Sequence, residues 1–231
     1  MKRHLLPFLL IITACVTNIR AETEMIDLKA LAKKARPAVM LLIVSDANGK
    51  EIATSTGFMV SADGKLITNY HVVRNAAALV AKAENGSEFP AMSVLVEDSL
   101  NDLALVRIKG RDFAFLSLGA GDNAEVGSRI AVIGSPLGLE GTLSEGIISA
   151  VRVSPEGQRV LQISAAISPG SSGSPVLNAY GEVIGVAAAK RPGGESLNFA
   201  APVKAAKVIL AQGETAVAQR SFNEGVPQQG N

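Results

Sequence analysis

Short apolar runs separated by turn residues dominate the chain after residue 37, and this pattern constrains the fold more than any other feature. The segments with strand character are Ala38–Val44, Gly57–Val60, Lys65–Val73, Asp102–Ile108, Arg129–Ile133, Thr142–Val153, Arg159–Ala166, Ser174–Leu177, Glu182–Ala189 and Leu197–Ala201. Asp63-Gly64 and Asn85-Gly86 lie between such runs, where they favour β-hairpins. No helical stretches alternate with the strands, so a parallel α/β sheet is disfavoured. The sequence therefore predicts an all-β sandwich or barrel.

Helical patterns occur only near the two ends of this β-rich region. Apolar residues recur at helical spacing over residues 26–35, and Pro37 ends that pattern. A second helix is expected over Lys204–Ala211, and a flexible polar tail over residues 213–231. The Gly-rich and less periodic segment Arg111–Gly127 predicts a boundary between two lobes.

Composition excludes several function classes. With 231 residues, 48% of them hydrophobic and 19% charged, the chain is a folded globular protein rather than a disordered one. Its net charge of +1 without a long basic run argues against a nucleic-acid partner. A single Cys excludes an intramolecular disulfide and a Cys-rich metal site. Of its two histidines, only His71 lies beyond the N-terminal leader.

The leader occupies residues 1–21 and predicts export. Basic Met1–His4 precedes the apolar run Leu5–Ala14, which is shorter than the ~20 residues that a membrane-spanning helix needs. Small residues precede Cys15 over residues 12–15, and this resembles a bacterial lipobox, which predicts lipidation of Cys15 and a membrane anchor. The alternative is a signal peptide cut after Ala21. Both interpretations place the protein in the bacterial periplasm or cell envelope.

One Gly- and Ser-rich segment has the character of a nucleophile loop. Segments such as Ser168–Pro175 are usually ordinary loops, but a Ser between glycines on a tight turn can be surrounded by the backbone N–H groups that stabilise an oxyanion. The segment departs from the Gly-x-Ser-x-Gly nucleophile elbow, because Ser174 stands where the last Gly would be. This departure argues against an α/β-hydrolase.

A base and an acid for this nucleophile are present upstream. A Ser nucleophile needs a base that titrates near neutral pH, and only His71 of the exported chain can serve. A histidine base in turn needs an acid that fixes its tautomer, a role that suits Asp102. The order His71, Asp102, Ser172 is that of the chymotrypsin-type triad, with the first two in one lobe and Ser172 in the other. Taken singly, His71 and Asp102 are more simply explained as structural residues.

The chain resembles the trypsin-like serine proteases of the HtrA/Deg type over roughly residues 26–210. The matching stretches, in family order, are Ser55–Phe58, Ile67–Val73, Asn101–Leu105, Ile133–Leu139, Gly146–Ala150, Ala165–Gly173 and Leu197–Ala200. The chain departs from the family pattern at Ser171, where Asn is usual, and at Ser174, where Gly is usual. The stretch after Pro202 is too short for the PDZ domain of the full-length family members, so the resemblance is to the protease domain alone.

The resemblance implies two six-stranded antiparallel β-barrels with short N- and C-terminal helices. The protease domain would span residues 26–212, with one barrel at about 37–115 and the other at about 120–202. It also implies an oxyanion hole formed by the N–H groups of Gly170 and Ser172, no cofactor, and protein or peptide substrates. A homo-oligomer is left open. The residues implied for the primary substrate pocket are Ala166 as its floor, Ile167, Val186, Ala187 and Ala188.

We therefore expect a serine endopeptidase that acts on unfolded or exported proteins. One alternative is a binding protein or holdase that keeps the protease fold but has negligible turnover. Another is a serine esterase for a small molecule, which is disfavoured because the expected cleft is open rather than a closed pocket.

Overall fold

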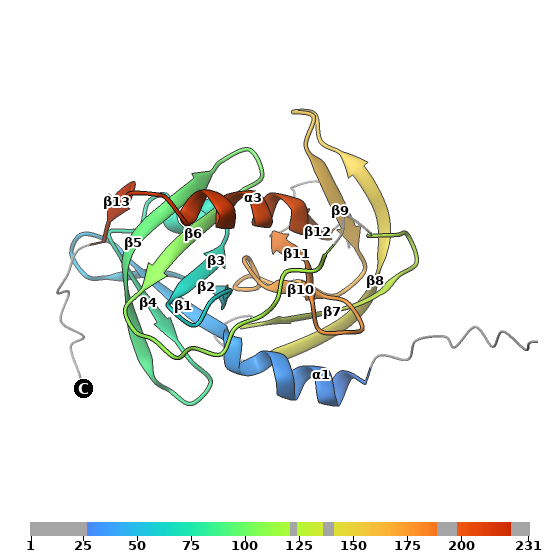
Figure 1. Ribbon diagram of the computed structural model, residues 1–231, viewed down its shortest axis with the longest axis horizontal. Helices are drawn as coiled ribbons and strands as arrows, with labels where there is room; N and C mark the ends of the chain where they lie inside the picture. Colours follow the sequence, from blue (N-terminus) through green and yellow to red (C-terminus); the bar gives the residue numbers. More distant parts are fainter. Residues whose placement is uncertain (1–26, 121–123, 136–140, 189–197, 223–231) are drawn as a thin grey trace, which may run out of the picture.

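Two antiparallel β-barrels lie side by side in the structure, a computed structural model that describes residues 27–120, 124–135, 141–188 and 198–222 (Figure 1). This arrangement confirms the predicted fold class. The leader with Cys15, and residues 223–231 of the tail, lie outside the described residues. Among the helices within the described ranges, none is long and apolar enough to cross a membrane.

The first barrel contains β1 (Val39–Ser45), β2 (Glu51–Met59), β3 (Lys65–Thr68), β4 (Ala78–Lys82), β5 (Glu88–Asp98) and β6 (Leu103–Ile108). The strand order β4-β1-β2-β3-β6 is closed by the pairing of β5 with both β4 and β6. Because successive residues of a strand face opposite sides, Met40 and Leu42 of β1 enter the interior of this barrel while Val39 faces away from it. The predicted hairpins at Asp63-Gly64 and Asn85-Gly86 are confirmed.

The second barrel contains β7 (Arg129–Gly134), β8 (Thr142–Val153), β9 (Arg159–Ile163), β10 (Pro175–Leu177), β11 (Val183–Ala188) and β12 (Asn198–Pro202). It closes in the order β10-β11-β12-β9-β8-β7. Alternation again divides most of its strands between two cores. Ile130 and Val132 of β7 pack inside the barrel, whereas Ala131 and Ile133 face the other barrel.

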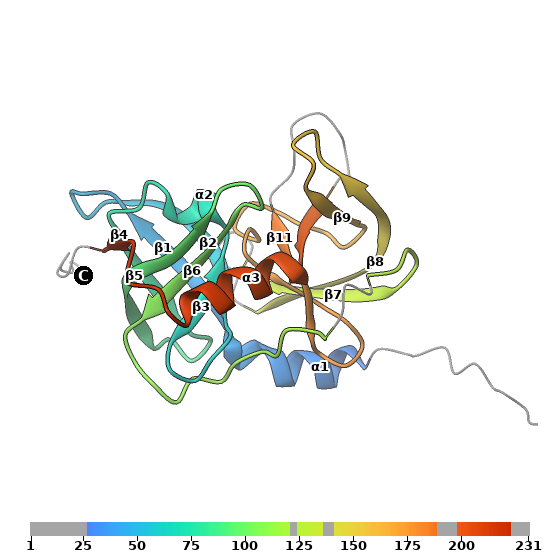
Figure 2. The same ribbon diagram turned by 45° about the horizontal axis from the view of Figure 1, so that its top comes forward.

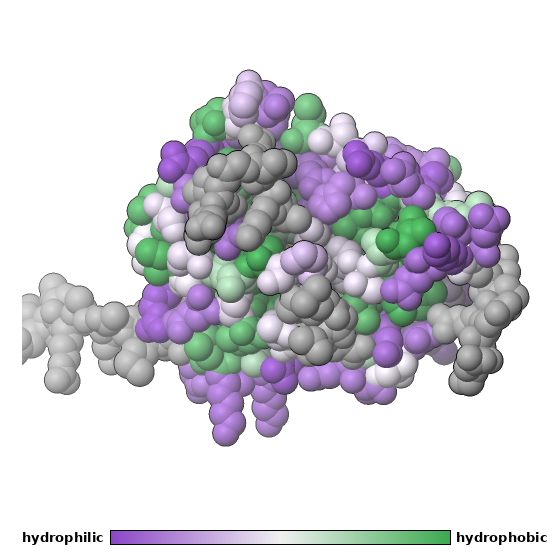
Figure 3. Space-filling view, turned by 180° about the vertical axis from the view of Figure 1, so that it is seen from behind, coloured by the Kyte–Doolittle hydropathy of each residue, from purple (hydrophilic) through white to green (hydrophobic). Residues whose placement is uncertain are grey.

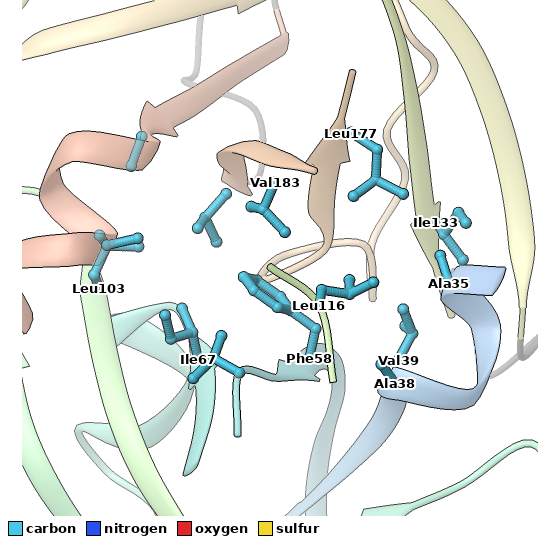
Figure 4. Packing of buried hydrophobic residues seen from close by; sticks show 14 of the residues in the cluster. Ala35, Ala38, Val39, Phe58, Ile67, Leu103, Leu116, Ile133, Leu177 and Val183 are labelled. Atoms are coloured by element: carbon cyan, nitrogen blue, oxygen red, sulfur yellow. The ribbon is translucent and has the colours of Figure 1, made fainter. Parts of the chain in front are cut away.

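A third core joins the two barrels. It is a continuous cluster of buried residues drawn from both barrels, the linker between them and the terminal helices. Figure 4 shows its central part, where the labelled residues include Phe58, Ile67 and Leu103 from the first barrel, Leu116 from the linker, and Ile133, Leu177 and Val183 from the second. Phe58 is fully buried there. Because protein interiors are close-packed, this core fixes one barrel against the other.

Helices cover the junction between the barrels. α1 (Leu28–Ala35) begins at Asp27, whose carboxylate accepts a hydrogen bond from Ala30 N at 3.0 Å, and is followed by a 3₁₀ turn, η1 (Arg36–Ala38). α3 (Val203–Gly213) crosses both barrels on another side (Figure 2). The two predicted helices are thus confirmed. Figure 3 shows the apolar residues of one outer face as separate small patches among hydrophilic ones.

The structure differs from expectation at Lys65–Val73, which we predicted to be one strand. β3 ends at Thr68, and a single helical turn, α2 (Tyr70–Val73), follows. The cause lies at Asp102, whose backbone carbonyl accepts hydrogen bonds from Tyr70 N (3.1 Å) and from Asn69 Nδ2 (2.8 Å). These bonds draw the chain out of the sheet directly after Thr68.

The described part of the tail also differs from the flexible segment that we expected from residue 213. β13 (Arg220–Ser221) pairs with β5, with Arg220 opposite Val94 and Ser221 opposite Ser93. The following Phe222 is 4% exposed and packs with the core of the first barrel. The polar composition of this segment gave no indication of the edge strand β13 or of the buried Phe222 ring that follows it.

Candidate active site

His71 and Asp102 form a two-point contact. The carboxylate of Asp102 accepts a hydrogen bond from the backbone N–H of His71 at 2.9 Å, and its other oxygen lies 2.7 Å from His71 Nδ1. Asp102 has a left-handed backbone conformation (φ 54°), which Asp tolerates better than most residues. With the carboxylate beside Nδ1, the proton of the neutral imidazole resides on Nδ1, and Nε2 is free to act as a base.

Ser172 lies on a turn whose backbone geometry suits an oxyanion hole. Ser171 N donates to Ser168 O at 2.9 Å, and Gly170 has φ 93°, as the third position of a type II turn requires, with Pro169 in the favoured second position. Within the described residues, no acceptor is recorded for the N–H groups of Gly170 and Ser172.

Hydrogen bonds to β2 of the first barrel hold this turn in place. The carbonyl of Ser172 accepts from Thr56 N and from Ser55 Oγ, both at 2.9 Å. Thr56 Oγ1 donates to Gly170 O at 2.7 Å and accepts from Ser135 N at 3.0 Å. Gly173 is required here, because a Cβ on it would clash with the Thr56 carbonyl and its φ is 82°.

The same β2 residue connects the turn to the segment that carries His71. Thr68 Oγ1 donates to Thr56 O at 2.7 Å, and Thr68 immediately precedes Asn69 and α2. The structure thus brings the predicted triad residues to the junction between the barrels, with His71 and Asp102 in direct contact. No hydrogen bond joins His71 to the Ser172 hydroxyl among the described residues. Such bonds are often long in unliganded sites and tighten when substrate binds.

Ser174, the departure from the family pattern after the nucleophile, is fully buried. The backbone around it pairs with β11, since Gly173 N donates to Ala187 O and Ala187 N donates to Ser174 O, both at 2.8 Å. Its hydroxyl has no hydrogen-bond partner among the described residues and lies where a Cβ on Gly134 would be. Ser174 is therefore accommodated by the absence of a side chain at Gly134.

The five residues implied for the primary substrate pocket differ in accessibility. Ala166 is exposed. Ala188 is half-buried and, with Asp102, lines a cavity of about 170 Å³. Ile167 and Ala187 pack in the core of the second barrel, and Val186 packs in the core between the barrels.

Two residues that our sequence analysis did not assign to the site support it. Asn198 Nδ2 donates to Ala165 O at 2.7 Å and so ties the start of β12 to the segment before Ala166. Thr56 joins both barrels, as described above. Each lies far along the chain from the residue that it binds. The one signal in the sequence was that both belong to stretches that match the family pattern. Among the described residues, no group of three or more His, Cys, Asp or Glu side chains is arranged to hold a metal ion.

Comparison with known proteins agrees with this geometry. Residues 55–186, which include His71, Asp102 and Ser172, match the model of the trypsin-like peptidase domain. The putative serine protease HhoB of Synechocystis sp. is 38% identical over 167 residues, covering 69% of this chain and 40% of that protein. A probable periplasmic serine endoprotease DegP-like from Chlamydia pneumoniae is 38% identical over 171 residues, covering 71% and 35%. The chain thus spans two fifths or less of the length of these two relatives.

Solved structures show the same similarity. The HtrA-type protease AlgW with a tripeptide superimposes with a TM-score of 0.71 at 31% identity, covering 79% of this chain and 62% of that one. The serine endoprotease from Yersinia pestis gives the same TM-score at 26% identity, covering 80% and 65%.

Proposed function

Because the chain belongs to the trypsin-like peptidase family, we propose that it is a serine endopeptidase with His71, Asp102 and Ser172 as its catalytic triad. The observation that carries this proposal is the double contact of Asp102 with His71, beside a Ser172 turn that is docked on the same barrel. The physiological substrates would be unfolded or exported proteins.

Acylation begins when Ser172 Oγ attacks the scissile carbonyl carbon. His71 Nε2 takes the hydroxyl proton as the new C–O bond forms, and the Asp102 carboxylate stabilises the resulting imidazolium. The N–H groups of Gly170 and Ser172 stabilise the negative charge on the carbonyl oxygen. His71 then gives its proton to the leaving amine as the C–N bond breaks, which leaves an acyl-enzyme on Ser172. Water attacks this ester by the same route, releases the acid and returns the proton to Ser172.

The primary pocket of this enzyme would accept small or medium aliphatic side chains such as Ala or Val. Of the five residues implied for the pocket, Ala166 and Ala188 are accessible and the other three are buried, and none of the five carries an acid. A bound Lys or Arg would be desolvated without a partner, at a cost of several kcal/mol. A peptide library in which cleavage after Lys or Arg dominates would contradict this specificity.

The proposal also includes export of the protein and a lipid anchor at Cys15. The leader at residues 1–21 supports export, as does the word periplasmic in the name of the relative from Chlamydia pneumoniae. A lipidated Cys15 would hold the enzyme on a membrane, because each buried CH₂ of an acyl chain contributes about 0.8 kcal/mol. We expect Cys15→Ser to move the protein from the detergent phase to the aqueous phase. An intact mass that begins with unmodified Glu22 would exclude the anchor.

The alternative to the endopeptidase is a protease-fold binding protein with negligible turnover. Casein hydrolysis separates the two functions. The endopeptidase cleaves casein in the wild type and not in Ser172→Ala, whereas a holdase suppresses aggregation of an unfolded protein equally in both and cleaves in neither. Parallel assay of a short ester separates the third function, because an esterase would hydrolyse the ester and leave casein intact.

A further inference from the structure

α2, the turn that carries His71, is too short to hold its own position. Its internal backbone bonds are Arg74 N to Tyr70 O at 2.9 Å and Val72 N to Asn69 O at 3.3 Å. A single helical turn gains too few hydrogen bonds to offset the ordering of its backbone, so partners outside the turn must fix it. Asp102 supplies those partners at the start of the turn, through Tyr70 N and His71 N.

The other end of the turn is held by Arg220, which comes from β13 near the end of the described chain. Its guanidinium donates to Val73 O at 2.6 Å and to Ala76 O at 2.7 Å. Val73 is fully buried and Ala76 is 4% exposed, so neither carbonyl is well placed to bond water instead. Short bonds from a charged donor are among the stronger hydrogen bonds of proteins.

Arg220 is itself fixed by its neighbours. The pairing of β13 with β5 is continued on both sides, by Gln219 N to Val94 O at 2.9 Å and Phe222 N to Met92 O at 3.0 Å (Figure 1). The guanidinium lies 5.2 Å from the centre of the Phe222 ring and 3.5 Å from the Glu97 carboxylate. The Phe222 ring packs in the same cluster as Val73 and Ala76.

From these contacts we propose that Arg220 is a positioning residue of the active site. It holds the carboxyl end of α2 while Asp102 holds the amino end, so that His71 keeps the orientation from which Nε2 reaches Ser172. Without Arg220, the carboxyl end of the turn loses its charged donor and keeps the bond from Ala76 N to Val73 O at 3.0 Å and the packing of the buried Val73 side chain, which we expect to hold it less firmly. The segment after α3 is thereby part of the support of the catalytic histidine. This inference rests on the proposed endopeptidase function.

Three variants of the exported protein test the inference. Arg220→Ala removes the bond to Val73 O at the end of α2 and the bond to Ala76 O just after it. Arg220→Lys keeps the charge and part of the donor capacity, and Gln219→Ala is the matched control. Gln219 belongs to the same segment, and among the described residues its side chain accepts one recorded hydrogen bond, from Glu97 N at 3.2 Å, and none from α2. For Arg220→Ala we expect kcat on casein-derived peptide to fall about ten- to a hundredfold, as for a small misplacement of a catalytic group, with KM within about twofold. Arg220→Lys should recover part of that loss, and Gln219→Ala should match the wild type.

A second readout does not depend on turnover. We expect the Nδ1 proton that His71 shares with Asp102, across 2.7 Å, to give a downfield proton NMR signal, which would be assigned by its absence in His71→Ala. We expect this signal to broaden or disappear in Arg220→Ala and to persist in Gln219→Ala. Folding of each variant is checked by its thermal unfolding. If Arg220→Ala does not fold, Arg220→Lys is compared with the wild type instead, and we expect a smaller loss of kcat and a weakened His71 signal.

The inference would be overturned by a folded Arg220→Ala with unchanged kcat and His71 signal, or by an equal loss in Gln219→Ala. A wild type without turnover would instead refute the proposed function. In that case the His71 signal would still decide whether Arg220 positions the turn.

Discussion

Thr56 holds the turn that carries Ser172 through its side chain and its backbone. Its hydroxyl serves Gly170 O and Ser135 N at once, and its backbone N–H holds Ser172 O. The residues proposed for the triad could be chosen from the sequence because the chemistry restricts the residue types, and His71 was the only candidate base beyond the leader. The role of Thr56 was not predictable, because a buried Thr on a strand has no pattern that reveals a partner 114 residues away.

Replacing Thr56 with Val tests this role. The loss of the hydroxyl leaves Gly170 O and Ser135 N without their partner, so we expect the free energy of unfolding in urea to fall by about 1 to 3 kcal/mol. The kcat should fall more than KM changes, because the substitution loosens the turn that we propose as the oxyanion hole. Thr54→Val is the control, since Thr54 lies two positions earlier on β2 and its hydroxyl has no recorded partner among the described residues. Equal effects of the two substitutions would contradict the role of Thr56.

At the scale of single elements, the strand pattern predicted most strands of the two barrels but not the helical turn α2, which carries His71. Residues 65–73 form a strand and then a helical turn because Asp102, distant in sequence, binds Asn69 and Tyr70. No local apolar period contains that information. The β13 pairing escaped prediction for a similar reason, since two residues at a sheet edge are too few to form a pattern.

The β2–β3 hairpin contains Asp63, whose carboxyl has a clearly lowered pKa. Hydrogen bonds from Ser61, then from Arg107 and Lys65, hold the pKa of the Asp63 carboxyl well below its usual range. Since the pKa of Asp is about 3.9 in an unfolded chain, this contribution to stability is present above about pH 4 and is lost as the pH falls through the lower folded value. We expect Asp63→Asn to lower the free energy of unfolding at pH 7 by no more than about 1 kcal/mol, because the carboxylate is half exposed.

Urea unfolding between pH 7 and pH 2 checks this expectation. The difference between wild type and Asp63→Asn should shrink below about pH 4, since protonation removes the same interaction from the wild type. The matched variant Asp112→Asn, whose side chain is 92% exposed, controls for the loss of a carboxylate. Parallel curves for wild type and Asp63→Asn across the whole pH range would refute the account.

On the scale of the whole molecule, the core between the barrels allows residues from two lobes to form one site. His71 and Asp102 belong to the first barrel and Ser172 to a loop of the second, so their distances depend on the packing around Phe58. The sequence pattern predicted two lobes but could not predict this core. A strand that is buried on both faces is apolar at nearly every position, so its sequence does not show which face meets the other barrel.

Phe58→Ala should therefore lower the stability of both barrels together. Removal of a fully buried Phe costs about 3 to 5 kcal/mol, and we expect one calorimetric transition in the wild type and one transition at lower temperature in the variant. Ile52→Ala is the control, as Ile52 lies on the same strand and is 50% exposed. Two transitions, of which only one moves in Phe58→Ala, would show that the barrels unfold independently.

The central claim is that the two barrels assemble His71, Asp102 and Ser172 into one nucleophilic site. The most direct measurement is covalent labelling by a fluorophosphonate, in which Ser172 Oγ attacks phosphorus and fluoride leaves, followed by intact-mass analysis and peptide mapping. We expect one adduct per chain, on Ser172, with a rate at least about 10³-fold lower in His71→Ala, because the two residues act as a unit. An unlabelled wild type, an adduct on another serine, or equal labelling of His71→Ala would contradict the claim.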